Sequence, residues 1–162
     1  MLDIVKYGDE ILARKSEPVT EFGPDFAAFV EELYVTMKEG NGVGLAASQV
    51  GRLQRVFVTG VEDDKLRVFA NPEIVFTSPD EVVYEEGCLS LPGLYTKVKR
   101  PASVKIQAYN EKGRPFTLEA KDFLARVILH EYDHLNGVLF IDRLSPLGKE
   151  RALAQYRKLA RM

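Results

Sequence analysis

Two histidines stand four residues apart around a glutamate in the segment His130-Glu131-Tyr132-Asp133-His134. On a helix, side chains four positions apart project from one face, so His130 and His134 can bind one metal ion. Glu131 is not a ligand in this pattern, and it can take the proton of a metal-bound water. The chain has only two histidines, so a chance pairing on a surface helix is the weaker interpretation.

The best candidate for a third ligand is Cys88, the only cysteine of the chain. Zinc proteases with this motif take a His or Glu as third ligand, usually downstream, and here only Glu150 follows His134. Asp133 should point to another face of the helix. A set of one Cys and two His leaves an open coordination position, which is typical of a catalytic site. With Glu131 to accept a proton, this pattern predicts hydrolysis.

The segment Gly42-Val43-Gly44-Leu45-Ala46-Ala47-Ser48-Gln49 matches the dinucleotide pattern G-x-G-x-x-A in its first six residues. That site needs a strand before it and a helix after it, whereas here an amphipathic helix precedes and Gly51 soon follows. A second interpretation is an open backbone against which a substrate lies, and a third is a tight turn with a surface Gln. If the chain is a hydrolase, Gln49 and the backbone N–H of Leu89 are candidate oxyanion donors.

Composition predicts one domain over residues 1–162, with 46% hydrophobic and 28% charged residues. The net charge of −2 argues against a chain built for DNA or RNA as a whole. A single cysteine suits a reducing cytoplasm. There is no apolar run long enough to span a bilayer and no secretory pattern at Met1–Val5.

Hydrophobic periodicity predicts a helix over 26–37, with one apolar stripe that ends at Gly40 to Gly42. Residues 55–120 read as short strands, with turns expected at Asn71-Pro72 and Pro92-Gly93 and a hairpin over 104–118. A second helix is expected over 122–136, with Asp122 as N-cap and the two histidines on it. Residues 138–141 suggest a short strand. Ser145-Pro146 should begin a last helix that packs through Leu147, Leu153, Tyr156 and Leu159.

Together these segments resemble the peptide deformylase family. Three of its motifs stand here in family order: residues 42–49, Glu86-Gly87-Cys88-Leu89-Ser90, and His130 to Gly137. Each motif alone is weak and the three together are specific. The short length and helical C-terminus resemble the compact bacterial type. Two positions depart from the family's commonest residues: Ser48, where Pro is frequent, and Leu129, where Gln is frequent.

The resemblance implies a metal-dependent hydrolase that removes the N-formyl group from N-formylmethionyl nascent peptides. It implies Cys88, His130 and His134 as ligands of one divalent ion, Glu131 as general acid/base for a metal-bound water, and Gln49 with the Leu89 amide at the oxyanion. Fe²⁺ is a common native ion in the family, and Zn²⁺, Ni²⁺ or Co²⁺ can replace it.

The predicted fold is α+β, with antiparallel strands packed around a central metal-binding helix, a helix in the N-terminal half and a C-terminal helix. We expect the peptide to lie extended beside residues 43–45 and 86–89, and so against Gly44 and Gly87, as an added strand. Val43, Tyr84 and Val127 are the expected methionine pocket. Two alternatives remain open: a zinc endopeptidase and a metal-stabilised binding module without activity.

The last twenty residues are strongly basic. From Arg143 to Met162 there are six cations and one anion, a net charge of +5 in a chain whose total is −2. Composition alone favours a solvated helix face. The family resemblance adds a second interpretation, in which this helix docks on ribosomal RNA near the nascent chain.

Overall fold

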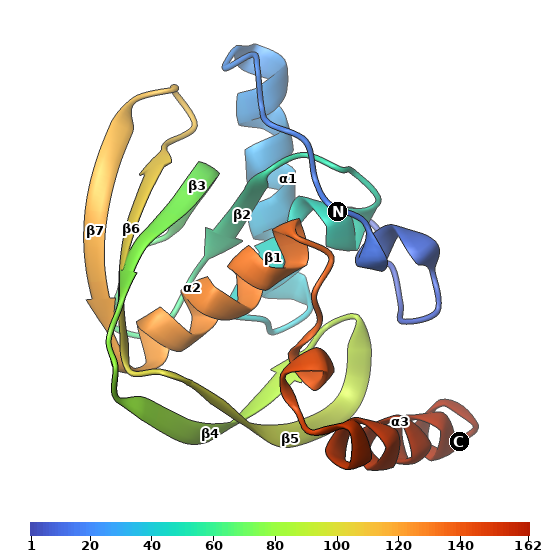
Figure 1. Ribbon diagram of the computed structural model, residues 1–162. Coiled ribbons are helices and arrows are strands. Elements are labelled where there is room, and N and C mark those ends of the chain that lie inside the picture. The colour runs from blue at the N-terminus through green and yellow to red at the C-terminus, as the bar shows by residue number, and fades with distance from the viewer.

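The computed structural model describes residues 1–162 and has five strands in one antiparallel sheet and two in another (Figure 1). The larger sheet has the order β1-β2-β3-β6-β7, and β4 pairs only with β5. The strands are β1 (Gly44–Ala46), β2 (Val56–Thr59), β3 (Arg67–Thr77), β4 (Glu81–Cys88), β5 (Leu91–Pro101), β6 (Ser103–Tyr109) and β7 (Pro115–Lys121). The α-helices are α1 (Pro24–Glu39), α2 (Asp122–Leu135) and α3 (Pro146–Ala160). Short 3₁₀ helices cover Glu10–Ala13, Ala47–Val50 and Phe140–Arg143. The expected α+β class is confirmed, with α2 at the centre.

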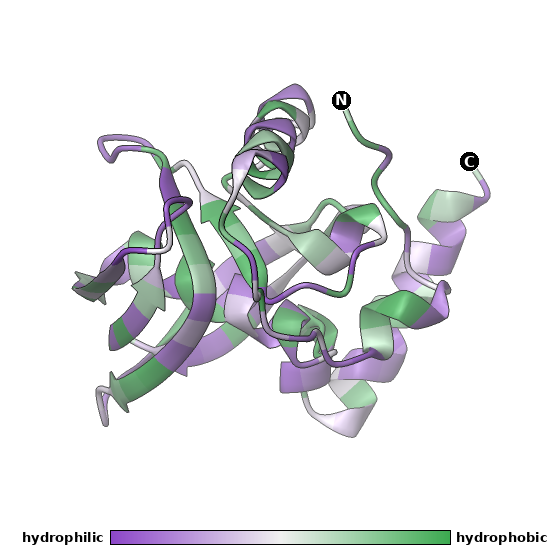
Figure 2. Ribbon diagram, turned by 90° about the horizontal axis from the view of Figure 1, so that it is seen from above, coloured by the Kyte–Doolittle hydropathy of each residue, from purple (hydrophilic) through white to green (hydrophobic).

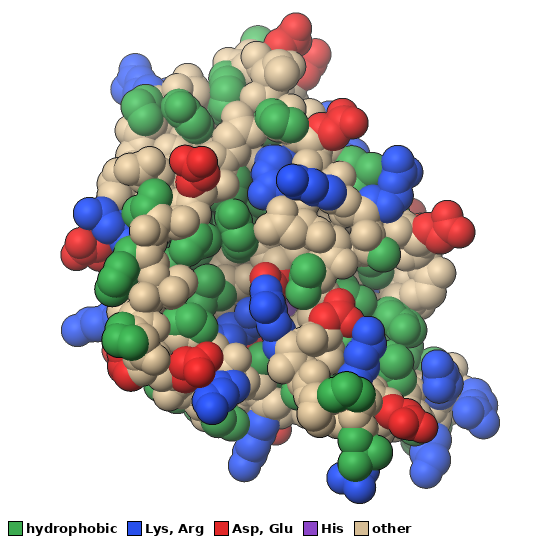
Figure 3. Space-filling view, viewed as in Figure 1, with side chains coloured by type: hydrophobic (Ala, Val, Ile, Leu, Met, Phe, Trp, Pro, Cys, Tyr) green, Lys and Arg blue, Asp and Glu red, His purple; other side chains and the backbone are tan.

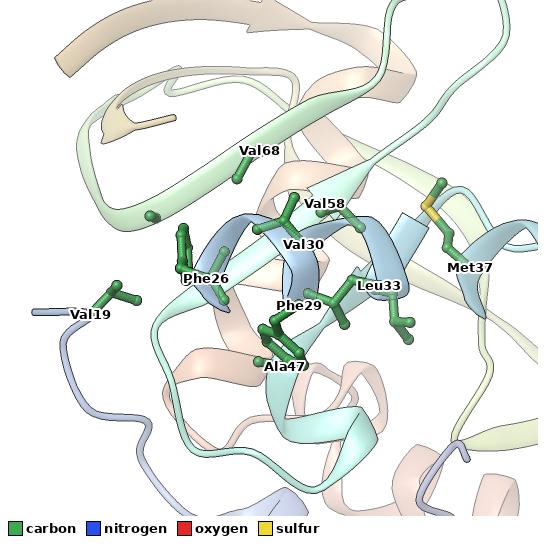
Figure 4. Close-up of a cluster of buried hydrophobic side chains, with 12 residues drawn as sticks. Val19, Phe26, Phe29, Val30, Leu33, Met37, Ala47, Val58 and Val68 are labelled. Carbon is green, nitrogen blue, oxygen red and sulfur yellow. The ribbon is translucent and has the colours of Figure 1, made fainter. Parts of the chain in front are cut away.

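Helices α1 and α2 cover opposite faces of the larger sheet. Successive side chains of a strand point to opposite faces, so Val56 and Val58 of β2 pack with α1 while Phe57 packs with α2. Figure 4 shows the first of these clusters, in which Phe29 and Leu33 of α1 lie against the sheet. Because both faces are covered, β2 is buried along its whole length.

A third hydrophobic cluster joins α3 to the smaller sheet. Leu94 and Val98 of β5 are buried in it with Ala152, the only fully buried residue of α3. Leu153, Tyr156 and Leu159 are half-buried, as expected for the packed side of this helix, but Leu147 is 55% exposed. Figure 2 shows the mixture of hydrophobic and hydrophilic residues along α3, which is typical of a helix that packs through one side only.

The turn expected at Asn71-Pro72 is wrong, because both residues lie inside β3. Asn71 has a φ of 47°, and pairing with β6 slips between Ala70 and Glu73. The turn-forming residues therefore make a bulge rather than a chain reversal. The Asn71 side chain accepts from the N–H of Val19 at 2.8 Å and donates to its carbonyl at 2.9 Å, which anchors the N-terminal segment on the sheet.

The turn expected at Pro92-Gly93 is also misplaced. Cys88 pairs with Leu91, so the β4–β5 hairpin reverses at Leu89 and Ser90. Gly87 pairs with Tyr95, which leaves residues 92–94 in a bulge where proline breaks no ladder hydrogen bond. Leu89 and Ser90 consequently lie at a tight tip directly after Cys88.

The three predicted helices are confirmed, with α1 extending two residues beyond each end of the predicted 26–37 and α2 ending one residue before the predicted 136. Two neighbouring predictions are wrong. The short strand expected at 138–141 does not form; the N–H of Leu139 bonds the Asp142 carboxylate at 2.8 Å and a 3₁₀ turn follows. Asp122 is not an N-cap but the first residue of α2, with a φ of 58°. Ser145 does cap α3, since its Oγ accepts from the N–H of Gly148 at 3.0 Å. None of the helices combines the length and apolar composition needed to cross a membrane.

Gly137 ends the third motif where the chain passes close to the N-terminal segment. Its φ is 73°, and a Cβ there would lie 2.5 Å from the carbonyl oxygen of Ala13. Gly51 has a similar φ of 87° with no atom within 4 Å of such a Cβ. We predict that Gly51→Ala lowers the free energy of unfolding by about 1 kcal/mol through backbone strain alone.

Gly137→Ala should lower the free energy of unfolding by about 2 kcal/mol or more beyond that, because the new methyl also overlaps backbone atoms. Urea unfolding of the two variants measures the difference. An equal loss of unfolding free energy in the two variants would mean that the backbone around Ala13 can move away from residue 137 at little cost.

Candidate metal centre

The three predicted ligands come together between α2 and the end of β4. Helix α2 presents His130 and His134 on one face, and Cys88 is the last residue of β4. Cys88 Sγ lies 3.4 Å from His134 Nε2, and one ligand atom from each of the three residues lies within 4.8 Å of the others. A tetrahedral ion at about 2.3 Å from sulfur and about 2.0 Å from nitrogen needs ligand atoms about 3.5 Å apart. The cluster therefore fits a divalent ion.

Glu86 orients the first histidine. Its Oε1 lies 2.9 Å from His130 Nδ1, so the other ring nitrogen, Nε2, is left for the metal cluster. A carboxylate in this position fixes both the ring and its tautomer, and it makes the imidazole a stronger ligand. Glu86 and Cys88 are two residues apart on β4, and side chains at that spacing share a face of a strand.

Two buried arginines also donate hydrogen bonds to the Glu86 carboxylate. Arg100 donates to Glu86 through Nε at 2.6 Å and Nη2 at 3.0 Å, and Arg126 Nη1 donates at 2.6 Å. Burial by itself would raise the pKa of Glu86, but the hydrogen bonds from His130 and Arg100 hold that pKa at about 2. Glu86 therefore stays a carboxylate, and its negative charge is paired with Arg100 of β5 and Arg126 of α2.

Asp133 belongs to this ionic network and not to the ligand set. Its carboxylate accepts from Arg100 Nη1 at 2.9 Å and from Arg143 at 2.6 and 3.0 Å. Both oxygens are thus occupied away from the metal cluster, as expected for a residue on another face of α2. The two acids and three arginines link β4, β5, α2 and the turn after α2.

The two imidazoles have opposite tendencies to bind a proton. Burial lowers the pKa of His134 well below its ordinary value, and the neighbouring His130 lowers it further. Burial also lowers the pKa of His130, but hydrogen bonds to Cys88 and Glu86 outweigh it and raise that pKa to about 10. A metal ion competes with this proton, since only a neutral imidazole nitrogen can be a ligand.

Glu131 lies in the site beside His130, and no hydrogen bond within the protein occupies its carboxyl group. The residue is 4% exposed, its Oε2 is 4.0 Å from His130 Nε2, and its Oε1 has no hydrogen-bond partner in the protein. Burial raises the pKa of this carboxyl group to about 7. A Cβ on Gly44 would lie 2.7 Å from Glu131 Oε2, so the glycine of the first motif leaves room for the carboxylate.

Gln49 is buried rather than on the surface, so the surface-Gln interpretation is wrong. The N–H of Ala46 donates to its Oε1 at 3.0 Å, and its Nε2 donates to Cys88 Sγ at 3.5 Å. Leu89 lines the same cleft, and a Cβ on Gly42 would be 2.8 Å from Leu89 Cδ1. The short β1 is followed by a 3₁₀ helix rather than an α-helix, which leaves no dinucleotide site at residues 42–49.

A cleft of about 580 Å³ opens onto the metal cluster. The predicted ligands Cys88 and His130 line it, as do Glu131, Gln49 and Leu89. All five residues expected to bind substrate line it too: Val43, Gly44, Tyr84, Gly87 and Val127. Sequence reasoning missed Phe123, whose ring meets that of Tyr84 edge-on with centroids 6.5 Å apart. The sequence did contain a signal for Phe123, because it is the second residue of the helix that carries the two histidines.

The two departures from the family pattern lie away from the cleft. Ser48 is fully buried, and its hydroxyl has no hydrogen-bond partner in the protein. Leu129 packs in the hydrophobic cluster between α2 and the larger sheet. Neither side chain lines the cleft.

Known proteins are similar to this chain in sequence and in structure over nearly its whole length. Residues 1–150 match the family model described as polypeptide deformylase. A peptide deformylase of Clostridium botulinum is 51% identical, over 87% of this chain and 95% of that one, and one of Treponema pallidum is 45% identical, over 94% and 93%. The crystal structure of a peptide deformylase from Legionella pneumophila superposes with a TM-score of 0.93 at 37% identity, over 99% and 96% of the two chains.

The role of Glu86 can be tested by substitution, with the adjacent Glu85 as a control. Glu86→Gln removes the charge that pairs with two buried arginines and replaces one carboxylate oxygen by an NH₂ donor, so it cannot accept from His130 and both arginines at once. We predict metal affinity lowered by about 10- to 100-fold and a free energy of unfolding lowered by about 3 kcal/mol or more. Competition with a chromophoric chelator and urea unfolding measure the two effects.

Glu85→Gln is the matched control for affinity and stability. Glu85 is the adjacent residue of β4, it is exposed, and it makes no ion pair within the protein. Glu85→Gln should leave the metal affinity and the free energy of unfolding near the wild-type values. Metal affinity equal in the two variants would show that Glu86 does not support His130.

Proposed function

The chain belongs to the polypeptide deformylase family, and we propose that Cys88, His130 and His134 hold the single divalent ion with which it works. The chain is a metal-dependent hydrolase that removes the N-formyl group from newly made polypeptides. The observation that carries the proposed site is the convergence of the Cys88 sulfur and two imidazoles, with the buried carboxyl group of Glu131 beside them, where a cleft opens.

A divalent ion bound there would supply a Lewis acid that polarises the formyl carbonyl and lowers the pKa of a water molecule. In our proposal, Glu131 takes the proton as water adds to the formyl carbon. It then gives that proton to the peptide nitrogen as the C–N bond breaks and formate leaves. The side-chain amide of Gln49 and the N–H of Leu89 donate to the oxygen on which negative charge develops.

We propose that the peptide lies as an extended strand between the two sheets. β1 is the first strand of the larger sheet and β4 has only β5 as a neighbour, so each has an edge without a partner strand. Residues 42–44, at the start of β1 and just before it, and residues 84–88 of β4 line the cleft. Backbone hydrogen bonds to such edges recognise any sequence. Val43, Tyr84 and Val127 then take the methionine side chain, with Phe123 as an added wall.

A donor set of one thiolate and two imidazoles suits Fe²⁺, Zn²⁺, Ni²⁺ and Co²⁺ alike. We propose Fe²⁺ as the native ion, with the other three as substitutes, because Fe²⁺ is a common native ion in the family. The cytoplasm is the proposed location, where the only cysteine stays reduced. We also propose one catalytic domain over residues 1–162. Hydrophobic clusters join α1 and α2 to the two faces of the larger sheet, and a third cluster joins α3 to the smaller sheet.

The proposed proton carrier is tested by Glu131→Gln. The variant keeps the shape of the side chain and all three ligands but has no base, so bound metal should stay near one ion per chain. Turnover of a formyl-Met peptide should fall by roughly 10²-fold or more, the scale of general acid–base catalysis. Elemental analysis and formate release measure the two quantities.

Wild-type turnover in that variant would remove Glu131 from the reaction. The same assay distinguishes a zinc endopeptidase, because a peptidase would cut internal bonds of formylated, acetylated and free peptides alike. Release of formate from the formylated peptide alone excludes that alternative. A binding module would release none.

We also propose that the ribosome is a partner of α3. Of the six cations in residues 143–162, Arg143 pairs with Asp133 and Lys149 with Asp142. The other four make no ion pair within the protein and are exposed: Arg151, Arg157, Lys158 and Arg161. Figure 3 shows the Lys and Arg side chains gathered at lower right, over α3. Such a surface suits the phosphates of RNA.

Arg157→Glu with Lys158→Glu tests this docking. We predict weaker co-sedimentation with ribosomes at low salt and unchanged activity on short formyl peptides. The double variant Lys112→Glu with Arg114→Glu has the same charge change in the exposed β6–β7 loop, and it should sediment as wild type does. If both double variants behave alike across a salt series, α3 has no docking role.

A further inference from the structure

Gln49 makes one contact that the proposed reaction does not use. Its Nε2 donates to Ser90 Oγ at 3.1 Å, in addition to facing Cys88 Sγ at 3.5 Å, while its Oε1 accepts from Ala46. An amide has two N–H groups on one nitrogen and a carbonyl acceptor at the other end. The backbone N–H of Ala46 can pair only with the oxygen, so these contacts determine which end faces the metal cluster.

Ser90 cannot act on the substrate directly. It is fully buried at the tip of the β4–β5 hairpin and does not line the cleft, whereas Gln49, Cys88 and Leu89 do. Its hydroxyl takes one N–H of Gln49 and leaves the second directed to the side of Cys88. Since hydrogen bonds weaken steeply with misalignment, a donor that can rotate stabilises an oxyanion less than a fixed one.

The N-terminal segment holds the backbones of Gln49 and Ser90 together by two main-chain hydrogen bonds. The N–H of Val5 donates to the carbonyl of Gln49 at 2.7 Å, and the N–H of Tyr7 donates to the carbonyl of Ser90 at 2.8 Å. Residues 4–7 form no strand, but in an extended chain alternate N–H groups point to one side. This N-terminal arm thus bridges two segments that are 41 positions apart in sequence. The ring of Tyr7 also meets Tyr156 of α3 edge-on at 6.1 Å.

We infer that Ser90 is a positioning residue for deformylation, whose hydroxyl fixes the orientation of the Gln49 amide while the N-terminal arm holds the two residues in register. The inference rests on the proposed oxyanion role of Gln49. It predicts an effect on turnover rather than on substrate binding, because the fixed N–H stabilises charge that develops only during the reaction.

The test is a double-mutant cycle on formate release from a formyl-Met peptide. Gln49→Ala should lower kcat by about 10²- to 10³-fold, as loss of an oxyanion donor does. Ser90→Ala should lower kcat by about tenfold or more, with KM changed less than about twofold and metal content unchanged. Ser90→Ala added to Gln49→Ala should cause no further loss, because residues that act through one group are not additive.

Ser48→Ala is the matched control. Ser48 is also fully buried and adjoins Gln49, but its hydroxyl has no partner in the protein, so its kcat should equal that of wild type. Thermal unfolding of every variant separates a loss of folded protein from a loss of turnover.

Independent effects of Ser90→Ala and Gln49→Ala on kcat would overturn the positioning role, as would equal losses for Ser48→Ala and Ser90→Ala. An unchanged kcat for Ser90→Ala would overturn it too. The wild-type protein in the same assay separates the two proposals. A wild-type chain that releases no formate overturns the proposed function and this inference with it, whereas formate release by wild type with an unchanged kcat for Ser90→Ala overturns this inference alone.

Discussion

The buried carboxylate of Glu86 joins the three elements on which the site depends. It stands on β4, it is met by Arg100 from β5, and it is met by Arg126 and His130 from α2. A buried charge is costly unless every partner is in place, so this set of bonds is satisfied only when the hairpin sits on α2 in one register. That same register carries Cys88, two residues along β4, to the two histidines. The ionic network therefore determines the geometry of the proposed metal centre as well as the packing.

The proposed oxyanion donors depend on a different set of contacts, made by two glycines, by main-chain groups and by the hydroxyl of Ser90. Gly42 lets the Leu89 side chain lie against the turn before β1, and Gly44 leaves room for Glu131. The N-terminal segment then bonds the carbonyls of Gln49 and Ser90. The first and second motifs thus meet through small residues, through the side-chain hydrogen bond from Gln49 to Ser90, and through the main-chain bonds of the N-terminal segment. A substitution that added a side chain at either glycine would displace a group that faces the cleft.

Local patterns in the sequence predicted much of this arrangement. The apolar stripe over 26–37 and the Ser145-Pro146 signal identified α1 and α3, because caps and periodicity are local properties. The predictions failed where tertiary contacts override local preference. Asn71-Pro72 became a bulge because Asn71 is bonded to Val19. Glu86 was part of a recognised motif, but its partners Arg100 and Arg126 are distant in sequence, and no local pattern indicates that an arginine will be buried. Its spacing of two from Cys88 on a strand was the available signal.

Cobalt reconstitution tests the central claim that Cys88 and the two histidines hold one ion. The account predicts one Co²⁺ per chain and a thiolate-to-cobalt charge-transfer band in the near-ultraviolet spectrum, because a coordinated cysteine is deprotonated. Cys88→Ser should lose that band. A wild-type protein that binds cobalt without the band, or a Cys88→Ser variant that keeps it, would contradict the account.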